Sequence, residues 1–478
     1  MNPFLTLLVF ALSSLALNLF AATPPAKPNF IVINIDDLGY ADIGPFGSKL
    51  NRTPHLDRMA TEGRKLTSFY AAPVCSPSRA ALMTGSYAKR ALPIPHVLFP
   101  GFAIGLSPSE ITVAEVLKSA GYATAIVGKW HLGDQPDFLP NNQGFDLHFG
   151  LPYSNDMGPS GDGVKSNLGD PLPKATKGGQ PPLPLLRNGQ VVKRVLPDDQ
   201  QSLVELYTDE TLAYIAAHKS SPFFLYLAHN AVHFPLYPGK KWAGKSPHGL
   251  YSDWVEEVDA GVGRILDALR AQGLAERTFV VFTSDNGGTQ RGLNTPLRGY
   301  KGSTWEGGIR VPTIAWWPGQ IPAGTATPTI AAMFDILPTF AALAGAKLPT
   351  DRKLDGVNLW PQLAGTSTAS ARETFFYYHG LRLAAVRHGD WKLHLAAPAA
   401  AAAAENKKKS APAELQLYNL KTDLAEAHNV AAAHPAVVAQ LQALIAAMQS
   451  DLGLDGPAPG SRPIGRVENP RHLIEFDK

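Results

Sequence analysis

Four short stretches of the chain are almost continuously apolar, and their composition predicts buried strands. Each is rich in β-branched or aromatic residues and shows no alternation of apolar and polar positions. That pattern is typical of strands covered on both faces, as in parallel sheets. The four stretches are NFIVINI (29–35), YATAIVG (122–128), PFFLYLA (222–228) and TFVVFTS (278–284).

Helical patterns lie between these stretches. In TVAEVLKSAG (112–121), Thr112 and Glu115 have the spacing of a capping box, and Gly121 is a stop signal. The segment 250–273 is amphipathic and ends at a glycine. Because strands alternate with helices, the pattern predicts an α/β fold with a large, mostly parallel central sheet sandwiched by helices.

The pattern changes after about residue 365. Short segments typical of antiparallel strands are followed by a helical pattern at 432–450. We therefore expect a large α/β domain over 23–365 and a smaller C-terminal subdomain, an antiparallel sheet plus a helix, over 366–478. Within this subdomain, the Ala- and Lys-rich stretch 397–414 has low complexity and predicts a surface loop.

The first 22 residues have the pattern of a secretory signal peptide. Residues 4–22 are apolar, carry no charge and end in small residues. No Lys or Arg precedes this run, and the run is long for a signal peptide, so an uncleaved N-terminal membrane anchor is the alternative. No later segment is apolar enough to span a bilayer. We expect a periplasmic or secreted bacterial protein without stable membrane insertion.

Charge and cysteine content narrow the classes of function. Lys and Arg exceed Asp and Glu by 43 to 40, which gives a net charge of +3 over 478 residues. So small an excess predicts no strong field for nucleic acid or an anionic membrane. The chain has one cysteine, Cys75, so it cannot form an internal disulfide even in an oxidising compartment.

Each predicted strand is followed by residues that handle metals or anions. In open α/β sheets, ligands bind beyond the carboxyl ends of the strands, so these positions are candidate site residues. They are Asp36 and Asp37 after the first strand, Lys129 and His131 after the second, His229 and His233 after the third, and Asp285 and Asn286 after the fourth. Four such endings favour a shared site over solvated loops.

The acid and amide residues of this set supply only oxygen ligands. Oxygen ligands suit Ca²⁺ or Mg²⁺ rather than zinc. Asp36 and Asp37 would repel each other unless a cation or a proton compensates their charge. A turn in which the two carboxylates cap backbone amides is the alternative.

The single cysteine lies in PVCSPSRAALMTG (73–85). The pattern predicts a helix start with Ser76 as N-cap and Pro77 as the first helical residue. Cys75 would then lie near the surface, just before a helix N-terminus that favours negative charge, with Arg79 reaching back toward it. A buried structural cysteine and a thiolate nucleophile are the alternatives. Neither explains the residues that follow the cysteine.

Those residues, CSPSR, resemble the modification signature Cys-x-Pro-x-Arg of the type I, formylglycine-dependent sulfatases, the arylsulfatase A-like enzymes of the alkaline phosphatase superfamily. The resemblance runs in order over roughly residues 28–430. It includes NFIVINIDDLGYADIGPFG, TPHLDRMATEG, GYATAIVGKWHLG, GLPYSNDMG, HNAVHFP, SDNGG, LRGYKGSTWEGGIRVP and the C-terminal WKL and LYNLKTD.

The resemblance implies a cofactor. A sulfatase-maturating enzyme would convert Cys75 to Cα-formylglycine, an aldehyde. One hydroxyl of the hydrated aldehyde would attack sulfur, and the other would later be deprotonated and expel sulfate. One divalent cation, usually Ca²⁺ in this family, would lie beside the modified residue, with ligands from Asp36, Asp37, Cys75, Asp285 and Asn286.

The resemblance also implies the roles of the remaining site residues. Arg79 and Lys129 would hold the aldehyde hydrate, with His131 beside it, whereas Ser154, His233 and Lys301 would contact the sulfate. His233 is the candidate general acid for the leaving alcohol and His131 the candidate base, each worth ~10²–10⁴-fold in rate. His229 has no clear role in the family, and we expect it to be structural.

The sequence therefore predicts a sulfatase that hydrolyses sulfate monoesters, either aryl sulfates or, in nature, sulfated carbohydrates. One alternative is a formylglycine-dependent phosphonate or phosphate ester hydrolase on the same scaffold. The other is an inactive protein that binds sulfated glycans. The segment 155–200 is rich in loop residues and follows Ser154, so we expect it to shape the substrate cleft.

Overall fold

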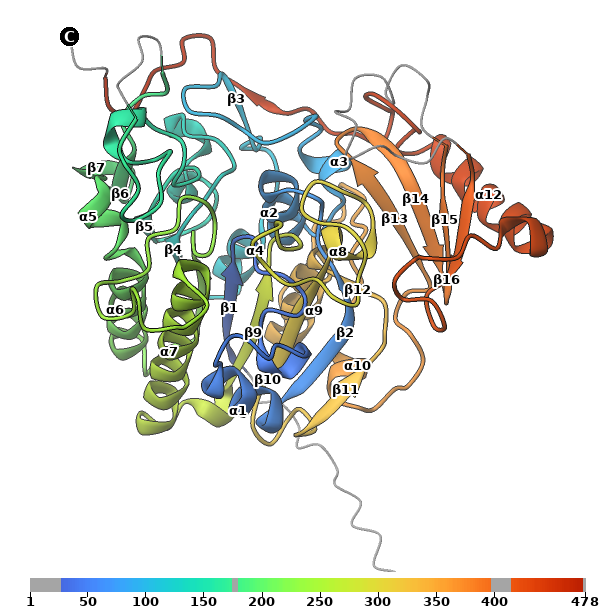
Figure 1. Cartoon of the computed structure of the whole chain (residues 1–478), viewed down its shortest axis with the longest axis horizontal. Helices are drawn as coiled ribbons and strands as arrows, with labels where there is room; N and C mark the ends of the chain where they lie inside the picture. The colour runs from blue at the N-terminus through green and yellow to red at the C-terminus, as the bar shows by residue number, and fades with distance from the viewer. Residues whose placement is uncertain (1–26, 174–178, 397–413, 476–478) are drawn as a thin grey trace, which may run out of the picture.

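The computed structural model describes residues 27–173, 179–396 and 414–475 (Figure 1). The predicted signal peptide (1–22) and nearly all of the low-complexity stretch 397–414 lie outside the described residues. Where the chain is described, we find no helix with the length and apolar character needed to cross a membrane.

The centre of the molecule is a sheet of 11 strands in the order β11-β2-β10-β9-β1-β8-β4-β5-β6-β7, with β12 beside β2. Near its middle, β1 (Asn29–Ile35) pairs in parallel with β9 (Thr278–Ser284) and with β8 (Phe223–Ala228). On its other side, β8 pairs in parallel with β4 (Ala123–Gly128). The four strands expected from the sequence are thus confirmed to within one residue, and they are neighbours.

The remaining strands extend this sheet on both sides. β5 continues the parallel part beside β4, whereas β10 and the β6–β7 hairpin run antiparallel to their neighbours. The segment 155–200, expected to consist of loops, contributes β6 and β7 to the sheet edge. The remaining strands of the central sheet are β2 (Arg64–Tyr70), β5 (Leu147–Gly150), β6 (Pro184–Arg187), β7 (Gln190–Arg194), β10 (Arg310–Trp316), β11 (Thr325–Thr327) and β12 (Ala331–Ala332).

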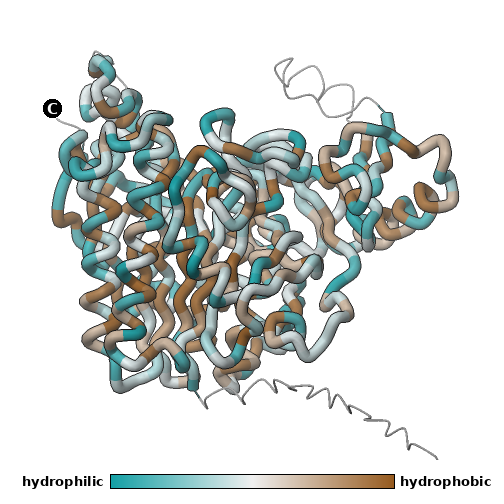
Figure 2. The backbone as a smooth tube through the Cα atoms, turned by 60° about the horizontal axis from the view of Figure 1, so that its bottom comes forward, coloured by the Kyte–Doolittle hydropathy of each residue, from teal (hydrophilic) through white to brown (hydrophobic). Residues whose placement is uncertain are grey.

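Helices cover both faces of the sheet, because alternate residues of each central strand enter different cores. Phe30 and Val32 belong to the core that contains α2, α4 and α9, whereas Ile31 and Ile33 belong to the core beneath α6 and α7. Apolar positions accordingly run through the body of the molecule (Figure 2). The helices are α1 (Pro54–Glu62), α2 (Cys75–Thr84), α3 (Ala88–Ala91), α4 (Val113–Ser119), α5 (Pro197–Gln200), α6 (Leu203–Ala217), α7 (Leu250–Ala271), α8 (Glu306–Ile309), α9 (Ile336–Ala344) and α10 (Trp360–Leu363).

The N-terminus of α4 has the predicted capping box. The Glu115 amide donates to Thr112 Oγ1 at 3.2 Å, and the Thr112 amide donates to Glu115 Oε2 at 2.7 Å. Local sequence alone specifies this helix start, since both partners lie within one turn.

The C-terminal region forms a second, antiparallel sheet of four strands with a helix against it, as predicted. The strands are β13 (Thr374–His379), β14 (Arg382–His388), β15 (Trp391–His394) and β16 (Gln416–Asn419), and the helix is α12 (Pro435–Gln449). Phe375 and Tyr377 pack against Tyr70 of the central sheet, with ring centroids 4.7 and 5.5 Å away. The two sheets therefore share one core, while the boundary at residue 365 stays a prediction.

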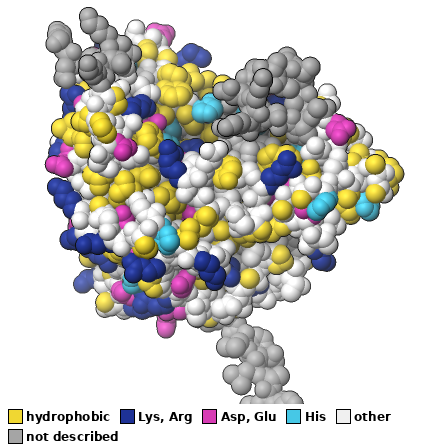
Figure 3. Space-filling model, viewed as in Figure 1, with side chains coloured by type: hydrophobic (Ala, Val, Ile, Leu, Met, Phe, Trp, Pro, Cys, Tyr) yellow, Lys and Arg dark blue, Asp and Glu magenta, His cyan; other side chains and the backbone are white. Residues whose placement is uncertain are grey.

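The chain then returns from the second sheet to the large domain. β17 (Gly465–Arg466) pairs with β3 (Ile104–Gly105), and Figure 1 shows this final segment crossing back over the top of the molecule. On the face shown in Figure 3, Lys and Arg side chains are scattered over the large domain with Asp and Glu among them. This mixture accords with the small net charge.

Candidate active site

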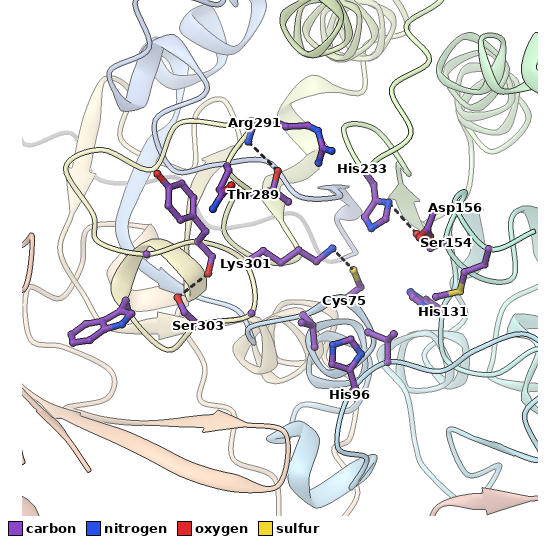
Figure 4. Close-up of a pocket in the computed structure, with 18 of the residues that line it drawn as sticks. Cys75, His96, His131, Ser154, Asp156, His233, Thr289, Arg291, Lys301 and Ser303 are labelled. Atoms are coloured by element: carbon purple, nitrogen blue, oxygen red, sulfur yellow. Dashed lines mark hydrogen bonds between the residues drawn. The ribbon is translucent and has the colours of Figure 1, made fainter. Parts of the chain in front are cut away.

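The segments that follow the parallel strands meet beside a pocket of about 860 Å³, and His131, Ser154 and His233 are among the residues that line it. Asp36 and Asp37 follow β1, Lys129 and His131 follow β4, His233 follows β8, and Asp285 and Asn286 follow β9. Ser154 follows β5, a parallel strand that the hydropathy pattern did not predict. Figure 4 shows Cys75 and Lys301 pointing toward each other, with His131, Ser154 and His233 on the opposite side.

Cys75 is the first residue of α2, and the predicted N-cap is wrong. Val74 is the N-cap and no side chain caps the helix, because Ser76 Oγ instead accepts a hydrogen bond from the Leu98 amide at 3.2 Å. Cys75 is also 2% exposed rather than near the surface. Burial raises the pKa of its thiol, and the carboxylates of Asp285 and Asp36 raise it further. The unmodified residue is therefore a neutral thiol.

Three predicted site residues surround this thiol. Cys75 Sγ lies 3.3 Å from Asp36 Oδ1, 3.6 Å from Asn286 Oδ1 and 3.6 Å from Lys301 Nζ. These residues come from three separate regions of the chain, so only the assembled sheet brings them together.

The four predicted oxygen ligands lie together and are buried. Asn286 Nδ2 donates to Asp37 Oδ1 at 2.8 Å, and the Asp37 amide lies 3.4 Å from Asp285 Oδ1. One ligand atom each from Asp36, Asp37, Cys75 and His233 falls within 4.8 Å of the others. Within the described residues, no backbone amide donates to the carboxylates of Asp36 or Asp37, which disfavours the alternative of a capped turn.

Three cations compensate the three buried carboxylates. Lys129 Nζ lies 2.5 Å from Asp36 Oδ2, Lys301 Nζ lies 2.6 Å from Asp37 Oδ1, and Arg79 Nη2 lies 2.7 Å from Asp285 Oδ2. Burial alone would raise the pKa of Asp36, but Lys129, His233, Arg79 and Lys301 hold it well below its usual value.

The carboxyl group of Asp285 differs from that of Asp36. Burial raises the pKa of Asp285, and the neighbouring charge of Asp36 raises it further. Neighbouring carboxylates repel each other, and a bound divalent cation would reduce this repulsion. Together with an amide oxygen they form a set of hard oxygen ligands. The residues present therefore fit Ca²⁺ or Mg²⁺.

His131 is a buried base with one free nitrogen. Its backbone is left-handed, with φ 64°, and its Nε2 donates to the Leu98 carbonyl at 2.9 Å. His131 lines the pocket, and its Nδ1 has no hydrogen-bond partner within the described residues. Burial lowers the pKa of His131 well below its usual value, and Lys129 and Arg79 lower it further. The ring is therefore neutral, with its proton on Nε2 and a lone pair on Nδ1.

The other two candidate histidines, His233 and His229, lie in different environments. His233 lines the pocket, with its Nδ1 3.3 Å from Ser154 Oγ and its Nε2 3.8 Å from Asp37 Oδ2. His229 does not line the pocket and packs against Tyr207, with ring centroids 6.0 Å apart. Burial lowers the pKa of His229 to about 3. This environment supports the structural role expected for His229.

Sequence reasoning missed the residues around the mouth of the pocket. They are His96, Phe99, Arg291, Arg298, Tyr300 and Trp305. Three of them flank Lys301 in LRGYKGSTWEGG. Their closeness to Lys301 in the sequence is the signal that could have identified them as pocket residues. Of the described part of 155–200, only Asp156 and Met157 line the pocket. The expectation that this segment shapes the cleft is therefore largely wrong, since the segment after β9 supplies more of the wall.

Both parts of the chain match known protein families. Residues 28–346 match the family model "Sulfatase", and residues 370–457 match "C-terminal region of aryl-sulfatase". N-acetylgalactosamine-6-sulfatase of Rattus norvegicus is 40% identical over 408 residues, or 80% of this chain and 74% of the relative. Arylsulfatase A of Homo sapiens is 39% identical over 463 residues, or 91% of this chain and 89% of the relative.

Solved structures give the same result for the fold. A crystal structure of Ps i-CgsB in complex with k-i-k-neocarrahexaose has a TM-score of 0.74 and 32% sequence identity to this chain. The alignment covers 88% of this chain and 92% of that chain.

Proposed function

The chain belongs to the sulfatase family and hydrolyses sulfate esters, and we propose that it does so with Cys75 converted to formylglycine beside one bound Ca²⁺ ion. The observation that carries the proposal is the position of the only thiol, between Asp36, Asn286 and Lys301. A thiolate nucleophile would need a lowered pKa, whereas the pKa of Cys75 is raised. The unmodified thiol is thus a poor nucleophile, which favours its modification.

Asp36, Asp37, Asp285 and Asn286 would hold the ion, because hard oxygen ligands suit Ca²⁺. When bound, the ion would polarise the oxygens of the sulfate, and the hydrate of formylglycine would supply a nucleophile that releases sulfate without a second attack at sulfur.

The cationic residues of the site orient the ester. Lys301 Nζ lies 3.6 Å from Cys75 Sγ, and its side chain is 19% exposed, so it faces both the nucleophile and the pocket. Lys129 Nζ donates to Ser154 Oγ at 3.2 Å, which aims Ser154 at the same space. Because Lys129 and Ser154 are buried, these donors stabilise charge that develops on the sulfate oxygens more strongly than they would in water.

The two pocket histidines serve as acid and base. His131 is neutral, with Nδ1 free to accept the proton whose removal releases sulfate. His233 lies beside Ser154 and lines the pocket, and its side chain is 13% exposed, so we assign it the donation of a proton to the leaving alcohol. Each proton transfer is worth ~10²–10⁴-fold in rate.

The mouth of the pocket favours a sulfated carbohydrate as the natural substrate. Tyr300 is 46% and Phe99 37% exposed, and such aromatic faces pack against sugar rings. Arg291 and Arg298 are exposed, and within the described residues no carboxylate forms an ion pair with either. Their guanidinium groups suit further sulfate or carboxylate groups on a glycan.

The compared proteins support the same class of substrate. The name of the rat relative includes N-acetylgalactosamine, and the Ps i-CgsB structure holds an oligosaccharide. The signal peptide pattern of residues 1–22 favours export. We propose that the enzyme works in the periplasm or outside the cell.

The decisive experiment uses one preparation for two measurements. We expect the tryptic peptide that spans residue 75 to have the mass of the aldehyde rather than of the thiol, and an aryl sulfate to be hydrolysed faster than the matching aryl phosphate. Faster phosphate hydrolysis would favour the phosphonate or phosphate hydrolase. Binding of a sulfated sugar without sulfate release would favour the inactive binding protein.

The metal is tested separately by chelation. After removal of divalent cations we expect loss of sulfate release, with recovery on adding Ca²⁺. At 100 times its dissociation constant, a ligand of the folded state contributes about 2.7 kcal/mol, so Tm should rise by several degrees. Asp37→Asn should abolish this rise, whereas Asp137→Asn, an exposed control, should keep it. An unchanged Tm and activity in chelator would rule the ion out.

A further inference from the structure

A second cluster of buried charges lies where the C-terminal sheet meets the large domain. We name it the Lys392 cluster, and it consists of Glu306 at the start of α8, Lys392 and His394 on β15, and Glu426. Lys392 belongs to the WKL motif and Glu426 follows LYNLKTD, two motifs that the proposed chemistry does not use.

The cluster is closely bonded within itself. Lys392 Nζ lies 2.9 Å from Glu306 Oε1 and 2.9 Å from Glu426 Oε1, and His394 Nε2 lies 2.7 Å from Glu426 Oε1. The hydroxyl groups of Tyr70 and Tyr377 donate to the Glu306 carboxylate at 2.6 and 2.8 Å. Such a network fixes the relative positions of its members, because breaking its bonds would leave buried polar groups unsatisfied.

The same cluster forms hydrogen bonds to the segment that carries Lys301. Lys392 Nζ donates to the Thr304 carbonyl at 2.8 Å, and the Glu306 amide donates to Glu426 Oε2 at 2.7 Å. Both anchors lie within five residues of Lys301 in the sequence. They join a segment that forms no strand or helix before Glu306 to the C-terminal subdomain.

The other end of the segment is attached as well. Arg298 Nη1 donates to the Glu426 carbonyl at 2.8 Å, and its guanidinium carbon lies 3.7 Å from the centre of the Trp305 ring. The Trp305 ring in turn packs against His394, with centroids 4.2 Å apart. The segment 298–306 is therefore attached to the C-terminal subdomain on both sides of Lys301.

The backbone of Glu426 is itself strained. Its φ is 51°, in the left-handed region, and the residue is fully buried. For a residue with a side chain this conformation costs about 1–2 kcal/mol, and it persists only where the surroundings impose it. The strained residue offers its carboxylate to the Glu306 amide and its carbonyl to Arg298, so the strain accompanies the attachment of the Lys301 segment.

We propose that Lys392 and Glu426 are positioning residues for Lys301, so that the C-terminal subdomain completes the active site of the large domain. The inference rests on the role in sulfate binding proposed above for Lys301. A long, flexible ammonium side chain is useful only if its backbone is held, since a misplacement of about 1 Å can cost ~10²-fold in rate. The large domain holds the backbone at Lys301 through the bonds from the Lys301 amide to the Gly288 carbonyl and from the Gly302 amide to the Pro73 carbonyl, and the Lys392 cluster adds the anchors on either side.

The test is a double-mutant cycle on purified, matured enzyme with an aryl sulfate. We expect Lys301→Ala to lower kcat/KM by at least ~10²-fold and Glu426→Gln by ~10–10²-fold. In the Lys301→Ala background, Glu426→Gln should change kcat/KM by no more than ~2-fold, because the group that it positions is gone. An equal effect in both backgrounds would overturn the proposal. Full activity of Lys301→Ala alone would instead refute the role of Lys301.

A matched control separates positioning from stability. Leu441→Ala removes a buried side chain of α12, which packs on the second sheet away from the Lys301 segment. It should lower Tm yet keep kcat/KM within ~2-fold of the wild type. Hydrogen exchange in the peptide 298–306 should increase in Glu426→Gln and not in Leu441→Ala. Equal exchange in both would contradict the proposal.

If Glu426→Gln does not fold, His394→Phe replaces it in the same cycle. This change keeps a ring beside Trp305 but removes the bond from His394 Nε2 to Glu426. We expect a loss of ~3–10-fold in kcat/KM that again disappears in the Lys301→Ala background. No loss, or the same loss in both backgrounds, would count against positioning.

Discussion

Two buried charge clusters of this enzyme have similar composition and different surroundings. The active-site cluster, which consists of Asp36, Asp37, Asp285, Arg79, Lys129 and Lys301, reaches a pocket of about 860 Å³ through Lys301. None of the four residues of the Lys392 cluster lines that pocket. Their charges are compensated by one another and by neighbouring Arg side chains, and a Tyr hydroxyl donates to Glu306.

The two clusters differ in how completely their buried polar and charged groups are paired. Beside the active-site cluster, His131 Nδ1 lacks a partner in the described part of the chain, and the pKa of Asp285 is raised. In the Lys392 cluster, no buried side-chain nitrogen or oxygen within the described residues lacks a partner. Buried polar groups that are fully paired fix a structure, whereas strained or unpaired groups next to a cavity are available for chemistry. Similar residues thus serve two purposes according to how completely they are paired.

The largest expected effect separates activity from stability in the active-site cluster. Cys75→Ala should lower sulfate release by at least ~10⁴-fold, because the nucleophile is lost. The free energy of unfolding should change by no more than ~1 kcal/mol, since the side chain removed at residue 75 is small and lies among polar groups. Turnover and urea denaturation of the matured wild type and of the purified variant measure the two quantities. Turnover at the wild-type rate would show that the mechanism is wrong.

A smaller effect should appear in the Lys392 cluster, where the charge of Glu306 makes the free energy of unfolding of the protein depend on pH. Burial alone would raise the pKa of Glu306, but Lys392, Arg310 and Arg387 hold it well below its usual value. Its ionisation therefore stabilises the folded state at pH values above the unfolded pKa of 4.5, and this contribution is lost as the pH falls toward the folded pKa.

Glu306→Gln should accordingly destabilise the protein by roughly 2–4 kcal/mol at pH 7. The difference from the wild type should shrink by about 2 kcal/mol between pH 6 and pH 3, as followed by urea denaturation. Glu276→Gln, at an exposed position, should show neither effect. A difference that does not depend on pH would mean that shape rather than charge accounts for the cost.

The smallest effect concerns the rim of the pocket. Arg291 is exposed, and its guanidinium carbon lies 5.0 Å from the centre of the Phe234 ring. Arg291→Met should raise KM by ~3–10-fold for a sulfated oligosaccharide with several anionic groups. KM for a small aryl sulfate should not change. Equal shifts for both substrates would place Arg291 near the reacting sulfate instead of at the rim.

Features specified by residues close together in the sequence were predicted correctly, whereas features that depend on contacts between distant residues were not. The four central strands and the capping box of α4 were predictable because apolar runs and pairs of residues one turn apart specify them locally. The N-cap at Ser76 was predicted wrongly because the Ser76 hydroxyl bonds to Leu98, 22 positions further along the chain. The segment 155–200 was taken for loops although part of it pairs at the edge of the sheet.

By itself, the sequence determined that acids, lysines and histidines stand at the ends of buried parallel strands and that the only cysteine lies in a sulfatase signature. Parallel pairing then requires those strand ends to meet at one edge. The tertiary structure alone decided which groups are left unpaired and how Lys392 and Glu426 reach the segment of Lys301. These contacts join residues 88 and 120 positions apart, and no local pattern encodes a distance between side chains that only the packing of two sheets creates.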